Sequence, residues 1–312
     1  MNTRTFAETL LERDAFLILS HRRPDGDTLG SGAALCSALR RMGKTAYIFP
    51  NPQTVPRTKT YVSAFEAPAD FQPQCVVAVD IATPGLFPFG YEGTPEFCVD
   101  HHPSNSLYAP LTLLNGARAS CGEIVAELIE TMTGSITPEE ATLLYIAATT
   151  DCGCFQYMNT NADTLRMAAH LIDCGADNHK VVHDFFRKVS RARVMLEGAI
   201  FSNMRFYRDG KITIAVVTRK LLADCGAEEN DCEDLAGLPG RIDSSVVSVL
   251  VREQPNGESR ISVRSTPEVD SCAVCAHFGG GGHKMAAGCT LDCDPETAVA
   301  RLLEAIEAEW PA

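Results

Sequence analysis

Residues 15–43 read AFLILSHRRPDGDTLGSGAALCSALRRMG, and in this stretch an apolar run passes through a polar turn into a helical pattern. Phe16 to Leu19 are continuously apolar, which is typical of a strand buried on both faces of a parallel sheet. The Pro-Asp-Gly sequence that begins at Pro24 is a common turn. Residues 28–43 have helical spacing, and Gly43 marks the end of the helix. The stretch therefore predicts a strand, a turn and a helix, the unit from which α/β folds are built.

Similar apolar runs recur along the first half of the chain, at residues 45–49, 75–80 and 96–100. After residue 118 the pattern becomes helical. The predicted helices, of which the second starts with a Thr-Pro cap, span residues 119–134, 137–151, 162–174 and 178–203. Alternation of buried strands with helices predicts an α/β domain with a doubly wound, mostly parallel sheet.

The second half of the chain predicts a smaller α/β domain with a mixed sheet. A strand at residues 211–217 precedes a hairpin at 244–266, which turns at Pro255-Asn256-Gly257. A helix at 270–277, a glycine run, a short strand and a last helix from Pro295 follow.

A length of 312 residues favours two domains. We expect a first domain at residues 1–190, a linker helix at 191–204 and a second domain at 205–312. The oligomeric state is left open, a homodimer included.

The charge balance limits the partners of the protein. It has 27 basic and 40 acidic residues, a formal net charge of -13, and lacks the broad basic footprint that long nucleic acid requires. A short, highly charged substrate that a local cluster holds is compatible with this balance. No apolar run approaches the ~20 residues of a membrane span, and the first residues lack a signal-peptide core. We expect a cytoplasmic protein without a membrane partner.

The thirteen cysteines are expected to be mostly free thiols, because disulfides are rare in a reducing compartment. Cys152 with Cys154, and Cys272 with Cys275, are close enough in sequence to suggest metal binding. Structural zinc needs a second pair at suitable spacing, and neither pair has a convincing one. We therefore expect these cysteines to pack rather than to bind zinc.

Acidic residues and histidines stand where the predicted strands end. They are His21, Asp25 and Asp27 after the first strand, Asp80 after the third, Asp100, His101 and His102 at the fourth, and Asp151 at a helix end. Each alone has an ordinary explanation as a turn residue, a helix cap or a structural histidine. Ligands bind beyond the carboxyl ends of parallel strands, so convergence at one sheet edge favours a joint role.

This set of side chains predicts a site for divalent cations. Carboxylates crowded together repel one another and shift their pKa values unless cations neutralise them. Mixed imidazole and carboxylate ligands suit Mn²⁺ or a similar ion. Two such ions ~3.5–4 Å apart would clamp a phosphoryl group and activate a water.

Four short motifs, in order along the chain, resemble those of the DHH phosphoesterases. They are HRRPDGD (21–27), VAVD (77–80), VDHHPSN (99–105) and ATTDCGCF (148–155). SVRS (262–265) and GGGGHKMAAG (279–288) resemble the DHH-associated C-terminal domain. The length and the domain pairing look like the bacterial branch that degrades very short RNA and dephosphorylates 3′-phosphoadenosine 5′-phosphate (pAp). One departure lies at Cys152 and Cys154, which flank Gly153 where that branch often has other residues.

The resemblance implies a role for each residue at the predicted sheet edge. One Mn²⁺ would be held by His21, Asp25 and Asp80. The other would be held by Asp27, Asp80, His101 and Asp151, so that Asp80 bridges the two ions, for which Mg²⁺ or Co²⁺ would be weaker substitutes. Asp100 would orient the histidines. His102 would contact the scissile phosphate or protonate the leaving oxygen.

The glycine run of the second domain is predicted to bind the substrate. Gly280, Gly281 and Gly282 let backbone N–H groups approach an anion without a Cβ in the way. His283 adds a donor, and the SVRS motif adds Arg264, whose planar fork suits phosphate, and Ser265. A flexible loop is the alternative, and a similar domain also ends alanyl-tRNA synthetases.

The leading functional prediction is a two-metal hydrolase that releases mononucleotides from very short oligoribonucleotides and phosphate from pAp. Hydrolysis of linear or cyclic dinucleotides in signal turnover is an alternative at the same site. A processive RecJ-type exonuclease should be longer and carry a basic groove, and a manganese-type pyrophosphatase should lack the glycine-rich loop. A nucleotide-binding regulator, the alternative without catalysis, should have lost a metal ligand.

Overall fold

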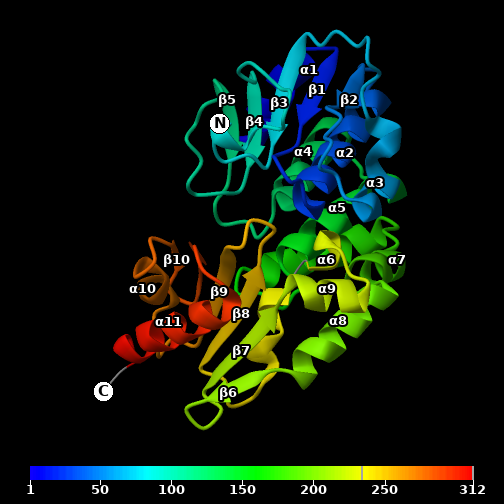
Figure 1. Ribbon diagram of the computed structural model, residues 1–312. Helices are drawn as coiled ribbons and strands as arrows, with labels where there is room; N and C mark the ends of the chain where they lie inside the picture. Colours follow the sequence, from blue (N-terminus) through cyan, green and yellow to red (C-terminus); the bar gives the residue numbers. More distant parts are fainter. Residues whose placement is uncertain (233–234, 311–312) are drawn as a thin grey trace. The chain divides into compact units, whose positions relative to one another are not determined.

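The computed structural model describes residues 1–232 and 235–310 (Figure 1). The chain divides into two compact units, Met1–Lys188 and Val189–Ala312. Within the described residues, no helix is long and apolar enough to cross a membrane.

The N-terminal unit contains a five-stranded sheet of order β2-β1-β3-β4-β5, in which all neighbouring strands are parallel (Figure 1). The strands are β1 (Phe16–Leu19), β2 (Ala46–Ile48), β3 (Cys75–Val79), β4 (Phe97–Asp100) and β5 (Leu111–Leu114). The predicted α/β class and parallel sheet are confirmed. The edge strand β5 was not predicted, because it is short and mostly half-buried and so lacks a continuous apolar run.

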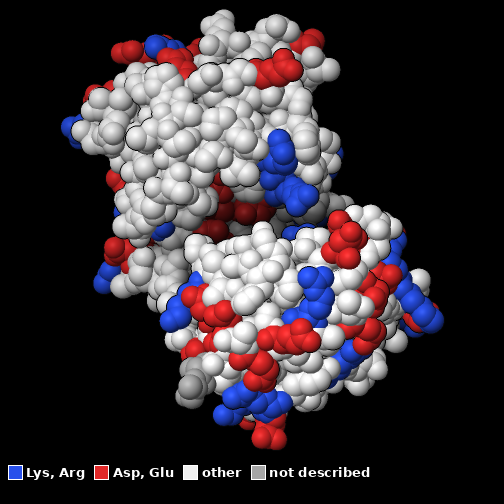
Figure 2. Space-filling view, turned by 60° about the vertical axis from the view of Figure 1, so that its left-hand side comes forward, with Lys and Arg blue, Asp and Glu red and all other residues white. Residues whose placement is uncertain are grey.

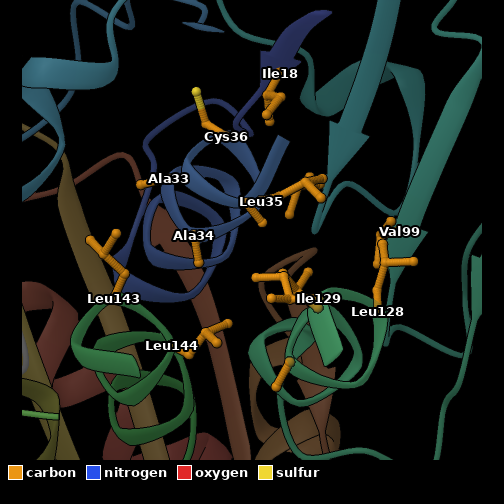
Figure 3. Packing of buried hydrophobic residues seen from close by; sticks show 14 of the residues in the cluster. Ile18, Ala33, Ala34, Leu35, Cys36, Val99, Leu128, Ile129, Leu143 and Leu144 are labelled. Carbon is orange, nitrogen blue, oxygen red and sulfur yellow. The ribbon is translucent and has the colours of Figure 1, made fainter. Parts of the chain in front are cut away.

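Helices pack on one face of this sheet. They are α1 (Thr3–Leu11), α2 (Gly26–Arg41), α3 (Pro56–Val62), α4 (Cys121–Thr133), α5 (Pro138–Asp151), α6 (Ala162–Asp173) and α7 (Asn178–Val182), with single turns η1 (Ser63–Phe65) and η3 (His183–Arg187). A further turn, η2 (Pro84–Leu86), lies in the connection between β3 and β4. Ile18 of β1 and Val99 of β4 belong to one buried cluster with Leu35 of α2 and Ile129 of α4 (Figure 3). The predicted cap of α5 is present as a capping box between Thr137 and Glu140.

Loops rather than helices cover the opposite face within the described residues, so loops stand there in place of the second helical layer expected of a doubly wound sheet. Leu19, Ala78 and Cys98 form a second buried cluster against aromatic residues of the connections between strands, among them Phe87 and Tyr108. The chain therefore crosses this face in loops that begin at the carboxyl ends of the strands, and these loops carry side chains toward that edge.

Three glycines allow α2, α4 and α5 to approach one another closely. A Cβ at Gly30 of α2 would lie 2.4 Å from the carbonyl oxygen of Leu143 in α5. A Cβ at Gly26 would lie 2.4 Å from Oγ1 of Thr150, and one at Gly122 of α4 would lie 2.6 Å from Cβ of Ala147. The close approach brings the first turns of α2 and α4 to the last turn of α5.

The C-terminal unit contains a six-stranded mixed sheet of order β10-β11-β9-β8-β7-β6, in which only β7 and β8 pair in parallel. Its elements are α8 (Arg191–Ser202), β6 (Arg205–Tyr207), β7 (Ile212–Val217), α9 (Arg219–Cys225), η4 (Glu229–Cys232), η5 (Leu235–Gly237), η6 (Pro239–Arg241), β8 (Val247–Glu253), β9 (Ser259–Ser265), α10 (Ser271–Ala276), β10 (Gly281–His283), β11 (Ala286–Leu291) and α11 (Pro295–Ala308). The smaller α/β domain with a mixed sheet is confirmed. The predicted hairpin is the antiparallel pair β8 and β9, with Gly257 of its turn at φ 84°.

The single helix predicted at residues 178–203 is wrong. Lys188 leaves the helical region with ψ 116°, after the π-helical turn η3. Ser190 then starts α8 as its N-cap, because its hydroxyl accepts a hydrogen bond of 2.9 Å from the backbone N–H of Arg193. The interruption coincides with the division between the two compact units.

We predict that Gly30→Ala destabilises the protein. The added methyl meets backbone rather than a flexible side chain, and overpacking of this kind costs about 1–3 kcal/mol. The matched control is Gly198→Ala in α8, where nothing lies within 4 Å of the added Cβ. This control should stabilise its helix by up to about 1 kcal/mol. Thermal unfolding of both variants tests the pair, and equal stability of Gly30→Ala and the unsubstituted protein would contradict the close packing.

Candidate metal centre

The eight predicted residues of the sheet edge lie together in the N-terminal unit. His21 follows β1, Asp80 follows β3, and Asp100 ends β4 immediately before the two other histidines. Asp25 is the N-cap of α2, Asp27 lies in its first turn, and Asp151 is the last residue of α5. The parallel sheet explains this convergence, because the carboxyl ends of its strands share one edge.

Their side chains form three overlapping groups that could hold a metal ion. The groups are His21, Asp25 and Asp80; Asp27, His101 and Asp151; and Asp80, His101 and His102. Nε2 of His21 lies 3.6 Å from both Oδ1 of Asp25 and Oδ2 of Asp80. Nε2 of His101 lies 3.5 Å from the other Asp80 oxygen, 3.7 Å from Oδ2 of Asp151 and 3.8 Å from Oδ2 of Asp27. Asp80 thus presents one carboxylate oxygen to His21 and the other to His101.

These separations suit coordination to a shared ion better than direct hydrogen bonds. Two ligand atoms that are each about 2.1 Å from the same ion are at most about 4.2 Å apart. Good N–H···O hydrogen bonds, in contrast, span about 2.7–3.2 Å.

Backbone carbonyl groups orient two of the histidines. Nδ1 of His21 donates to the carbonyl oxygen of Arg22 at 2.9 Å, and Nδ1 of His101 donates to that of Arg118 at 3.2 Å. Because a carbonyl can only accept, Nδ1 carries the proton in both rings. In the neutral ring, each Nε2 is then left with a lone pair that faces the carboxylates, as a metal ligand requires.

Asp27 is completely buried and held by the ends of two helices. Its Oδ2 accepts from the backbone N–H of Cys121 at 2.7 Å, and its Oδ1 accepts from Gly122 at 3.0 Å. The hydroxyl of Ser31 donates to the same Oδ1 at 3.0 Å. The N-terminus of α4 thus fixes the carboxylate of α2 and favours its negative charge.

Asp100 is also completely buried, and it fixes the loop that carries the two histidines. It accepts from Nδ1 of His102 at 2.8 Å, from Nδ2 of Asn105 at 2.6 Å and from the backbone N–H of His101 at 2.8 Å. Burial alone would raise the pKa of Asp100, but the hydrogen bonds from His102 and Asn105 outweigh it and hold that pKa below its ordinary value. Asp100 is therefore a charged acceptor that orients His102.

Asp80 is unfavourable in two respects, its backbone conformation and the negative charges around its carboxylate. Its φ is 61°, in the left-handed region that is costly for a residue with a Cβ. Burial first, and then the charges of Asp27 and Asp25, raise the pKa of Asp80 well above its ordinary value. Burial and the charges of Asp151 and Asp25 do the same for Asp27. A positive charge among these groups would remove the penalty.

Two buried polar atoms at the centre of the cluster lack a hydrogen-bond partner among the described residues. They are Oδ1 of Asp80 and Nε2 of His101, which face each other at 3.5 Å. Such buried atoms are rare unless an ion or water satisfies them. Divalent cations fit this cluster, because it has unpartnered polar atoms, an oxygen-rich donor set and carboxyl groups with raised pKa values. Such ligands suit Mn²⁺ or Mg²⁺.

Sequence reasoning missed three residues that position the cluster. Asn105 lies in the quoted VDHHPSN motif, which was the available signal. Arg118 acts through its backbone carbonyl, while its guanidinium lies 3.6 Å from the buried Glu123. Nδ2 of Asn159 donates to the carbonyl oxygen of Asp151 at 3.2 Å. Contacts to backbone carbonyls depend on tertiary structure and leave no residue pattern.

Cys152 and Cys154 belong to a tight turn of the backbone directly after Asp151. Gly153, Cys154 and Phe155 have φ values of 56°, 53° and 66°. The buried Sγ of Cys152 accepts from the backbone N–H of Phe155 at 3.3 Å and so supports this turn. All thirteen cysteines are free thiols in this structure.

The glycine run of the C-terminal unit is partly a strand and not the flexible loop that was the alternative to a binding role. Gly281 to His283 form the edge strand β10, which pairs antiparallel with β11. A Cβ at Gly280 would lie 2.4 Å from Cβ of Cys289, and one at Gly282 would lie 2.5 Å from the carbonyl oxygen of Ala286. Glycine is therefore required here by close backbone packing, whereas Gly281 is open.

The other predicted substrate residues lie beside this run. Arg264 on β9 pairs with Ala286 on β11, and both Arg264 and His283 are exposed. The hydroxyl of Ser265 donates to the carbonyl oxygen of Val269 at 2.7 Å and lies 2.8 Å from the hydroxyl of Ser271. Arg264 and His283 are thus open to a ligand, while Ser265 holds the neighbouring turn.

The fold and the sheet-edge cluster define a two-domain α/β protein with a carboxylate and histidine centre of the kind found in metal-dependent hydrolases. Residues 15–148 match the DHH family, N-terminal domain, and residues 209–310 match the DHHA1 domain. The chain is 34% identical over 297 residues to the Bifunctional oligoribonuclease and PAP phosphatase NrnA of Thermus thermophilus, covering 94% of this chain and 89% of that protein. The chain belongs to the DHH family of phosphoesterases.

Two further comparisons extend this result. An exopolyphosphatase-related protein from Bacteroides fragilis has the same fold, with a TM-score of 0.86, 24% identity and coverage of 98% of this chain and 96% of that chain. The Cyclic-di-AMP phosphodiesterase GdpP of Geobacillus thermodenitrificans is 25% identical over 329 residues, which cover 96% of this chain and 48% of that protein.

We predict that the metal-free protein loses stability as pH rises. The pKa values of Asp27, Asp80 and Asp151 are raised on folding, mainly by burial, so the folded state binds more protons than the unfolded chain. Their contribution is fully present below the ordinary carboxyl pKa of about 3.9 and is lost as pH rises through the raised values. Melting temperatures in chelator, from about pH 4 to about pH 8, measure this effect.

Mn²⁺ at 100 times its dissociation constant should restore about 2.7 kcal/mol near neutral pH. Asp27→Asn is the control, since it removes one of the three carboxyl groups and should reduce the pH dependence. A melting temperature that neither pH nor Mn²⁺ changes would contradict this account of the cluster.

Proposed function

We propose that this protein hydrolyses very short oligoribonucleotides to mononucleotides, and pAp to AMP and phosphate, with two Mn²⁺ ions at the sheet edge. The observation that carries the proposal is the position of Asp80, whose two oxygens face two separate groups of ligands. One carboxylate between two such groups is the arrangement that a two-ion centre needs. The 34% identity to a protein named for both activities supports the choice of substrates.

In this proposal His21, Asp25 and Asp80 would hold one ion. Asp27, His101 and Asp151 would hold the other together with Asp80, whose Oδ1 lies 3.5 Å from Nε2 of His101. Bound divalent ions would neutralise the carboxylates, polarise the phosphoryl group and lower the pKa of a water molecule.

His102 has a different role from His21 and His101, because its Nδ1 is bound by a carboxylate instead of a backbone carbonyl group. Its Nδ1 donates to Asp100, so Nε2 is the atom left for the substrate, and 43% of the side chain is exposed. The negative charge of Asp100 favours the protonated ring and thus raises the pKa of His102. We propose that His102 contacts the scissile phosphate or donates a proton to the leaving oxygen.

The C-terminal unit supplies the grip on the nucleotide. Arg264 offers a planar fork suited to phosphate, and His283 adds a donor on the neighbouring edge. The backbone N–H groups of the glycine run can approach an anion closely, since Gly281 presents no side chain.

The distribution of charge favours short substrates. On the face that Figure 2 shows, basic and acidic side chains are interspersed rather than gathered in one basic surface. Each additional phosphate of a long RNA would approach a protein of net charge -13 without compensating cations. Cyclic dinucleotides are the second candidate, because a relative of 25% identity is named a cyclic-di-AMP phosphodiesterase.

Turnover of a substrate panel tests the proposal. With Mn²⁺, the protein should hydrolyse an RNA dinucleotide and pAp, and kcat/KM should fall as RNA grows beyond several nucleotides. Asp80→Asn should abolish both activities, because it weakens the shared ligand, while asparagine tolerates the left-handed backbone of that position. Full activity in excess chelator would contradict the metal-dependent mechanism. Preferred turnover of cyclic-di-AMP, or of a long RNA, would replace the proposed substrates.

Substitution of Arg264 separates substrate grip from chemistry. We expect Arg264→Ala to raise KM for a dinucleotide about tenfold or more, and to lower kcat less, since loss of a charge-assisted contact costs about 1.5–3 kcal/mol. The exposed Arg260, on the same strand β9, provides the control in Arg260→Ala. An unchanged KM in Arg264→Ala would remove this residue from the substrate site.

A further inference from the structure

Phe89 is a large aromatic side chain that the loop after β3 leaves in solvent. Its exposed fraction is 53%, whereas the aromatic rings around it are packed together. Phe87 contacts Tyr91 edge to face at 5.5 Å between centroids, and it contacts Tyr108 at 5.3 Å. These contacts anchor the loop on the buried cluster beneath it. Phe89 is thus presented to solvent by a well-packed support.

The guanidinium group of Arg22 lies over this ring. The Arg22 Cζ atom is 4.3 Å from the centroid of Phe89. The backbone N–H of Arg22 donates to the carbonyl oxygen of Leu86 at 2.6 Å, which fixes the two loops to each other. The carbonyl oxygen of Arg22 accepts from Nδ1 of His21 at 2.9 Å. The stacked pair is therefore connected directly to a residue of the candidate metal centre.

Arg22 and the adjacent Arg23 carry positive charges that no described carboxylate neutralises. Among the residues that the structure describes, neither Arg22 nor the adjacent Arg23 has a carboxylate within ion-pair distance, and both are exposed. Arg23 is fixed instead through its backbone, which has φ 56° and whose N–H donates to Oε1 of Gln53 at 3.2 Å. Two unpaired cations beside a cluster of carboxylates are suited to a phosphate-bearing ligand.

A single exposed phenylalanine would need no explanation. An aromatic ring stacked with a guanidinium group is, however, the surface on which unpaired bases of single-stranded RNA stack. The proposed substrates differ in their need for such a surface. Hydrolysis of pAp releases phosphate, so only one nucleoside is bound, whereas a dinucleotide places a second nucleoside beyond the scissile phosphate.

We propose that Arg22 and Phe89 form the subsite for the nucleobase of this second nucleoside. The base stacks on the exposed surface of the pair, and the charge of Arg22 lies near the phosphate that joins the two nucleosides. The subsite rests on the proposed function, and it predicts that the two activities depend differently on these side chains. Phe89 is a specificity-determining residue for oligoribonucleotides and has no contact with pAp.

The test compares three substrates in the Mn²⁺-loaded protein: pAp, the dinucleotide pApA, and a pApA analogue whose second nucleoside lacks its base. Base stacking contributes enough that Phe89→Ala should raise KM for pApA about tenfold. KM for pAp and for the abasic analogue should stay within about twofold, since neither carries the second base. Phe89→Trp should retain low KM for pApA, because the larger ring preserves the stacking surface.

Phe206→Ala is the matched control, since Phe206 is equally exposed at 54% and lies on β6 of the other unit. It should change no KM value. Equal loss for pApA and pAp in Phe89→Ala would show a structural role, and unchanged KM for all three substrates would show no role; either result overturns the subsite.

A direct binding measurement separates this proposal from the proposed function. Calorimetric titration gives the affinity ratio of pApA to its abasic analogue without requiring turnover. A protein that hydrolyses neither pApA nor pAp would contradict the proposed function. The subsite would still be supported if Phe89→Ala removed a preference for pApA over the abasic analogue, and overturned if no such preference existed.

Discussion

The repulsion between buried carboxylates is the constraint on which the N-terminal unit depends. Asp27 and Asp80 are almost without solvent contact, and each faces further acidic groups at close range. In the absence of opposite charge, such an arrangement favours protonation or expansion. The surrounding structure holds the carboxylates in place through backbone donors and short helix contacts. The free energy of their repulsion is therefore retained in the folded protein, and a bound cation would relieve it.

The glycine contacts of α2 and α5 serve this same arrangement. Because Gly26 and Gly30 remove two side chains from the contact, the helices approach until Asp27 and Asp151 reach one histidine. The N-terminus of α4 completes the support, since its first N–H groups bind Asp27. Apolar packing and charge placement are therefore linked in one group of helices, in which a change of spacing would alter both.

Much of this edge could be predicted from the sequence, because the residues that end strands are also the residues that meet in a parallel sheet. His21, Asp80 and Asp100 could be placed from the apolar runs before them. The order of the four motifs then agreed with the family match. The pattern could not reveal Arg118, whose backbone carbonyl orients His101, nor the break in the helix after Arg187. Such features depend on contacts between distant segments or on one capping hydroxyl. The strand β10 escaped prediction for a related reason, since glycine carries no β signal of its own and pairs only because β11 lies alongside.

The position of β10 at the edge of its sheet has a consequence for behaviour at high concentration. An edge strand exposes unpaired backbone groups to which another polypeptide can add, and aggregation often begins there. The strand formed by Gly281 to His283 is a weak site for such pairing, since it is three residues long and has no apolar side chain. The exposed Lys284 follows directly and adds charge. The glycines that allow β10 to pack closely against β11 thus also make this edge a poor template for strand addition.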